Sequence, residues 1–152
     1  MGNIFYNHPL QKMRLNSILF RSYFVNSSIF KYRRQDRKID KKSKNLIGLV
    51  NDHHVIPKSL HKHRALTRVD YQIHQGYNLM IMPNQPGVIQ KLNLHPETLI
   101  HQGGHMKYNS YVKNNLDALN NLQSNDELAY YIWLFVDYLK KMSKRNGDLP
   151  WN

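Results

Sequence analysis

The sequence predicts an α+β fold in which two short strands come first and helices complete the core. Two observations favour this class. Two β-branched or apolar runs each end at a proline, and a long amphipathic helical pattern fills the C-terminal part of the chain. The length of 152 residues fits one domain with an extension. We expect residues 1–45 to form a basic helix and arm, and residues 46–152 to form the folded domain.

Positive charge is concentrated near the N-terminus. The chain has 22 Lys and Arg against 10 Asp and Glu, and residues 1–44 hold eleven of these basic residues but only two of the acids. Such an excess favours a polyanionic partner, with nucleic acid ahead of an acidic membrane surface. The sequence has no cysteine, so any metal would have to be held by His, Asp, Glu or Asn.

The first half of the chain is expected to begin with a short amphipathic helix over residues 9–24. Basic and polar residues then alternate from Lys31 to Lys44. This run indicates either a solvated helix or linker, or an arm that lies along phosphates. Leu46 to Pro57 is predicted to be the first strand, with Gly48 at a turn or bulge. Residues 58–68 are predicted to be a loop that contains a helical turn.

The second half is expected to start with a strand that ends at Pro83, antiparallel to the first strand after a long connection. Residues 84–98 contain two prolines and a glycine and are predicted to be irregular. A helix should follow and reach about Leu122. The final helix is expected to have Asn125 as its N-cap and to stop at Gly147.

The most unusual stretch is Asp52-His53-His54-Val55-Ile56-Pro57. Adjacent side chains on a strand point to opposite faces, so the two imidazoles would have separate surroundings and separate tasks. One could bind a metal while the other takes a proton from water near neutral pH. His101 and His105, which are separated by Gln-Gly-Gly, offer two further metal ligands.

Taken in chain order, these motifs resemble the HNH, or His-Me finger, nuclease superfamily with its ββα-metal core, and in detail the AHH-type nucleases. The matching segments are His53–Pro57, Asn78–Pro83 and His101–His105 with Tyr108. The resemblance covers about residues 50–115, so the basic arm and the last helix lie outside it.

The resemblance implies a metal-dependent endonuclease that hydrolyses phosphodiester bonds of nucleic acid, with DNA ahead of RNA. It implies that His54 is the general base and that His53, His101 and His105 hold one divalent metal ion. Asn78 would orient the loop that carries His54. The ion could be Mg, Mn, Zn or Ni, and three imidazoles suit Mg less well than the others.

Three basic residues flank these motifs, and we expect them to contact backbone phosphates: Lys58, Arg64 and Lys107. This expectation rests on proximity in the sequence, and a solvated face is the alternative. The other histidines of the segment, His61, His63 and His74, are expected to be exposed.

Several alternatives stay open from the sequence. An Asp-His start is the commoner one in HNH enzymes, and in that register Asp52 would bind the metal and His53 would be the base. The chain could also be a noncatalytic nucleic-acid-binding protein with a structural zinc site, or a membrane-associated basic protein. Its length favours an intracellular, soluble nuclease of a virus, phage or mobile element over a secreted toxin. An organellar presequence would also fit the basic N-terminus.

Overall fold

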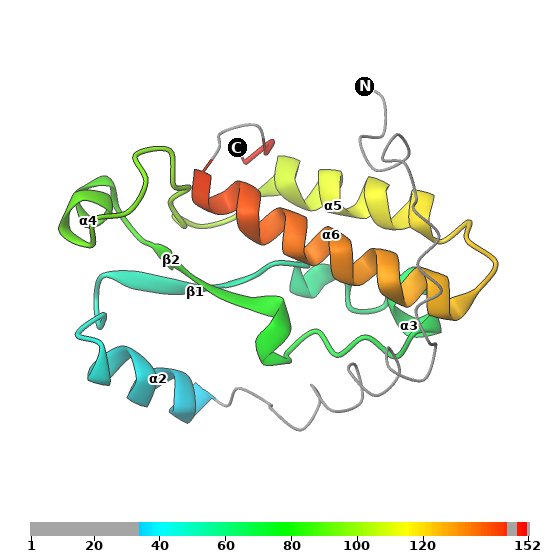
Figure 1. The fold of residues 1–152 in the computed structure, drawn as a ribbon, viewed down its shortest axis with the longest axis horizontal. Helices are drawn as coiled ribbons and strands as arrows, with labels where there is room; N and C mark the ends of the chain where they lie inside the picture. Colours follow the sequence, from blue (N-terminus) through cyan, green and yellow to red (C-terminus); the bar gives the residue numbers. More distant parts are fainter. Residues whose placement is uncertain (1–33, 146–148, 152) are drawn as a thin grey trace.

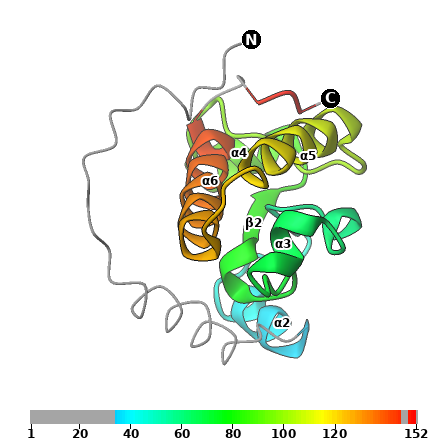
Figure 2. The same cartoon turned by 90° about the vertical axis from the view of Figure 1, so that its right-hand side faces the viewer.

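The computed structural model describes residues 34–145 and 149–151. The helix expected over residues 9–24 lies outside these residues. The described chain combines a two-stranded antiparallel sheet with several helices, which confirms the α+β class. Helices α5 (Met106–Leu119) and α6 (Asn125–Arg145) lie on one side of the two strands, and α2 (Arg34–Ser43) lies on the other (Figures 1 and 2).

The sheet consists of β1 (Val50–His54) and β2 (Leu79–Pro83), which pair along their whole length. The first strand is therefore shorter than the predicted range of residues 46–57. It starts late because Gly48 has a φ of 78°, a left-handed conformation that belongs to a turn. It ends early because the backbone of Ile56 is bonded by the side chain of Asn78 instead of a strand partner.

The connection between the strands contains three short helical segments. These are η2 (Lys58–Leu60), α3 (Arg64–Arg68) and η3 (Gly76–Asn78), so the expected helical turn is confirmed. The prediction of an irregular segment after the second strand was wrong in part, since α4 (Pro86–Lys91) lies there. Proline fits the first turn of a helix because it has no N–H to leave unpaired, and Pro86 takes that place.

The last two helices differ from the prediction at their ends. Helix α5 stops at Leu119, earlier than expected. Asn125 lies inside α6, and Ser124 is the residue whose Oγ accepts a hydrogen bond from the backbone N–H of Glu127, at 3.3 Å. Asn125 was therefore the wrong choice of N-cap, and its side chain accepts hydrogen bonds from Arg68 instead. Among the described residues, no helix is long and apolar enough to cross a membrane.

One hydrophobic core joins the end of the first strand to α3, α5 and α6. Its fully buried members include Val55, Ile56, Leu66, Tyr108, Val112, Leu116, Leu128, Ile132, Phe135 and Leu139. The apolar stripe predicted for the last helix is thus confirmed as core. This core fixes the β1 end that carries the histidine pair against the start of α5.

Candidate metal centre

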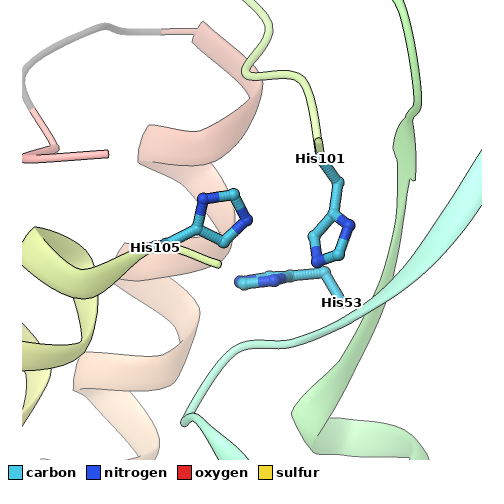
Figure 3. A group of neighbouring side chains, drawn as sticks. All are labelled: His53, His101 and His105. Atoms are coloured by element: carbon cyan, nitrogen blue, oxygen red, sulfur yellow. The ribbon is translucent and has the colours of Figure 1, made fainter. Parts of the chain in front are cut away.

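Three histidines from separate segments point toward one another (Figure 3). His53 lies on β1, His101 lies on the loop before α5, and His105 is the residue that precedes the first turn of α5. Each offers a ring nitrogen, and these nitrogens all lie within 4.8 Å of one another. We call these residues the histidine cluster.

The polar atoms of the histidine cluster fit a divalent cation. Within the described residues, Nε2 of His53 and Nδ1 of His101 are buried and have no hydrogen-bond partner. A buried polar atom without a partner costs free energy, so these nitrogens are poorly explained as structural groups. Imidazole nitrogens at this spacing are ordinary ligands of zinc and similar metals.

The electrostatics of the cluster keep the rings of His53 and His101 neutral, which is the form that binds a metal. Burial, together with the neighbouring His101 and His105, lowers the pKa of His53 to about 3. Burial and His105 likewise lower the pKa of His101. Both imidazoles are therefore neutral at physiological pH and have lone pairs to offer.

Backbone bonds hold the His101 segment against the sheet. The N–H of His101 donates to the carbonyl of Pro83 at 2.8 Å, and its carbonyl accepts from the Asn51 side chain at 3.1 Å. Gly103, with a φ of 111°, then lets the chain turn toward His105. His101 thus lies before the helix, and His105 immediately precedes its first turn.

The second histidine of the pair faces away from the cluster. Nε2 of His54 and Nδ1 of His74 share a hydrogen bond of 3.2 Å. Burial, then the charge of Lys58 and the presence of His74, lower the pKa of His54 to about 4. His54 is therefore neutral near pH 7 and able to accept a proton. His74 is exposed as expected, but its contact with His54 was missed because nothing in the sequence links the two.

The loop after His54 is fixed by Asn78, which is fully buried. Its Oδ1 accepts from the N–H of Ile56 at 2.8 Å and from the hydroxyl of Tyr71 at 2.9 Å. Its Nδ2 donates to the carbonyls of Ile56 and Ile73. The hydroxyl of Tyr108 also donates to the carbonyl of Val55, at 2.6 Å. The chain just beyond His54 is therefore held from two sides.

One comparison with known proteins, the comparison with protein families, found a match. A family described as a nuclease family of the HNH/ENDO VII superfamily with conserved AHH matches residues 37–131, which is more than half of the chain. The chain belongs to this AHH nuclease family. The predicted resemblance is thereby confirmed, and the protein is a nuclease that hydrolyses phosphodiester bonds. No curated protein and no solved structure matched the chain.

The chain departs from the AHH pattern at one position, because Asp52 stands before its only adjacent histidine pair. The Asp52 carboxylate pairs with Arg37 Nε at 2.9 Å and with Lys41 Nζ at 2.8 Å, both from α2. It is not a member of the histidine cluster. The register in which Asp52 binds the metal and His53 is the base has no support in this geometry.

The three basic residues expected to bind phosphates are all exposed. Lys58 is the one whose charge acts on His54, where it lowers the pKa. Arg64 and Lys107 are known here only as exposed side chains, so their part in binding stays a prediction.

His63 is not exposed as predicted, since only 10% of its side chain is accessible. It caps α3, with Nδ1 accepting from the N–H of Ala65 at 3.2 Å, and its Nε2 lies 2.9 Å from Asp117 Oδ1. Both of its ring nitrogens therefore make hydrogen bonds within the protein.

One residue of the site was missed entirely. Trp151 is buried against the histidine cluster, and its Nε1 donates to the carbonyl of Ile100 at 2.8 Å. It follows Gly147 and Pro150, where the sequence shows only the end of a helix, so no pattern pointed to it.

Proposed function

We propose that this AHH nuclease is a metal-dependent endonuclease with DNA as its substrate ahead of RNA. In this proposal His53, His101 and His105 hold one divalent ion, and His54 is the general base. The separation of the adjacent histidines carries the proposal. One ring enters a cluster of three imidazoles while the other lies apart from it, beside His74. The net charge of +12 supports a polyanionic substrate.

His54 takes the proton of the attacking water in this proposal. Its lowered pKa keeps the ring neutral near pH 7, which is the form that accepts a proton, and also makes the imidazole a weaker base than a free one. The hydrogen bond with His74 engages Nε2 and so leaves Nδ1 for the water. When bound, the divalent ion supplies positive charge that offsets the negative charge developing on the phosphate.

Asn78 keeps His54 in place through the bonds it makes with Ile56. Its role is that of a positioning residue, since it is buried and does not reach substrate. Lys58 is exposed beside His54 and is the basic side chain best placed to hold a phosphate of the substrate. Arg64 and Lys107 are proposed to contact phosphates farther along the nucleic acid.

The test is cleavage of supercoiled plasmid and of single-stranded RNA by the wild type and by His54→Ala. Each is incubated with EDTA and then with magnesium, manganese, zinc or nickel. The wild type should nick the plasmid only with metal, and His54→Ala should lower the rate by about 10²- to 10⁴-fold, as loss of a general base does. His95→Ala is the matched control, because His95 is an exposed histidine outside the cluster.

Circular dichroism and metal binding of His54→Ala should match those of the wild type, since its side chain is not in the cluster. A folded wild type that cuts neither DNA nor RNA with any metal would contradict the proposal and support a noncatalytic protein with a structural zinc site. Cutting of RNA alone would overturn the choice of DNA.

A further inference from the structure

The end of the described chain returns to the histidine cluster. After α6, Leu149 and Trp151 are buried, with 4% and 8% of their surface exposed. Both lie beyond residues 37–131, where the family match ends. The family relationship therefore says nothing about them, and their role has to be argued from their contacts.

Trp151 contacts every segment that carries a ligand of the cluster. Its ring centroid lies 4.0 Å from that of His105, with the planes inclined by 31°, and 5.1 Å from that of His53. Its Nε1 donates to the carbonyl of Ile100, the residue before His101. It also packs against Tyr108, at 5.0 Å between centroids. One side chain thus joins β1, the loop before α5, and the start of α5.

The orientation of the His53 ring has to be fixed by a neighbouring side chain. Metal-binding histidines usually donate their second ring N–H to a carboxylate or carbonyl, and this bond fixes the ring orientation. Within the described chain the ring of His53 makes no hydrogen bond, and its neighbours are the aromatic rings of Trp151 and Tyr108 together with His101 and His105. Packing of rings takes the place of the usual hydrogen bond.

We propose that Trp151 is a positioning residue of the metal centre, which holds His53, His105 and the His101 segment in the arrangement that binds the ion. This inference rests on the proposed metal site of the histidine cluster. It assigns the C-terminal end of the chain, outside the family match, to the function of the nuclease.

The first measurement is a titration with Co²⁺, followed by its visible absorption and by competition with Zn²⁺. Trp151→Ala should weaken metal affinity by about 10- to 100-fold, the usual effect of removing support for metal ligands. Trp151→Phe keeps an aromatic ring and should stay closer to the wild type. Trp133→Phe is the matched control, because Trp133 is the other tryptophan and lies in the middle of α6. It should bind Co²⁺ as the wild type does.

A second readout uses the same control. With two tryptophans in the chain, Trp133→Phe leaves Trp151 as the single tryptophan, whose emission is excited selectively beyond the absorption of the tyrosines. Co²⁺ in the histidine cluster should quench this emission strongly because quenching by a paramagnetic ion requires short range. Excess Zn²⁺ should displace Co²⁺ and restore the emission.

The outcomes separate this inference from the proposed function. A folded wild type that binds neither Co²⁺ nor Zn²⁺ would overturn the metal site and the role of Trp151 together. Wild-type binding with an unchanged affinity and spectrum in Trp151→Ala would overturn the role of Trp151 alone. If Trp151→Ala fails to fold in EDTA, the fluorescence decides: quenching supports the inference, and unquenched emission with bound Co²⁺ overturns it.

Discussion

Two buried polar sites on the same hairpin differ in how their polar atoms are paired. Asn78 uses its oxygen twice as an acceptor and its amide twice as a donor, all within the protein. His53 is also buried, yet its Nε2 has no partner in the described chain. Fully paired polar groups stabilise a fold, whereas an unpaired one costs free energy unless a ligand satisfies it. The difference indicates that Asn78 serves the structure and that the histidine cluster serves a ligand.

Replacing His53 by leucine should have the largest effect on function and little effect on folding. His53→Leu should lower metal affinity and plasmid cleavage by at least about 100-fold, since a metal ligand is lost. The metal-free free energy of unfolding should change by less than about 1.5 kcal/mol, because an apolar side chain of similar size replaces an unpaired polar one. Urea denaturation in EDTA measures this quantity, and a loss of several kcal/mol would mean that His53 is structural.

Replacing Asn78 should do the reverse and destabilise the metal-free protein by about 3 kcal/mol or more. Asn78→Ala leaves the Ile56 backbone, the Ile73 carbonyl and the Tyr71 hydroxyl without their partner, and each unpaired buried group costs about 1–3 kcal/mol. Asn84→Ala is the control, because Asn84 donates one exposed bond to Gly48 and should cost about 1 kcal/mol or less. Equal losses for the two variants, measured by urea denaturation, would contradict the distinction.

The smallest effect is expected at His63, a histidine whose two ring nitrogens are both hydrogen-bonded. His63→Ala should cost about 1 kcal/mol because α3 loses its cap, and His63→Asn should recover much of this since asparagine also caps helices. Metal affinity should stay at the wild-type value in both variants. A weakened affinity for Co²⁺ would show that bonded histidines outside the cluster also support the metal centre.

Much of the site could be predicted because the chemistry lies in short local motifs. Each motif spans only a few residues of the sequence: the histidine pair, the His101–His105 spacing, and the asparagine before the second strand. Alternation along a strand then predicts that His53 and His54 diverge, and the structure places them in separate surroundings.

The missed contacts are those that join distant parts of the chain. His74 approaches His54 across 20 residues of connection, and Trp151 reaches Ile100 across 51. Arg68 belonged to a predicted loop, yet its guanidinium donates to the carbonyls of Asn120 and Leu122, just beyond the end of α5. Such pairings depend on tertiary packing, which no local periodicity encodes.

Element ends were missed where a side chain competes with the regular backbone pattern. The second strand and the core face of the last helix follow from apolar periodicity alone. The end of β1 depends on the Asn78 side chain, and the start of α6 depends on the choice between Ser124 and Asn125. Both residue types cap helices well, so the sequence could not separate them.

The strict pairing of β1 with β2 has a consequence for how this protein can evolve. His53 lies opposite Met80 and His54 opposite Leu79, and a shift of one residue would turn each side chain to the other face. Inserting or deleting a single residue within Val50–His54 would exchange the two imidazoles while leaving the composition almost unchanged. Outside the histidine pair, this five-residue strand should therefore tolerate substitutions but no change in length, whereas the turn before it can absorb both.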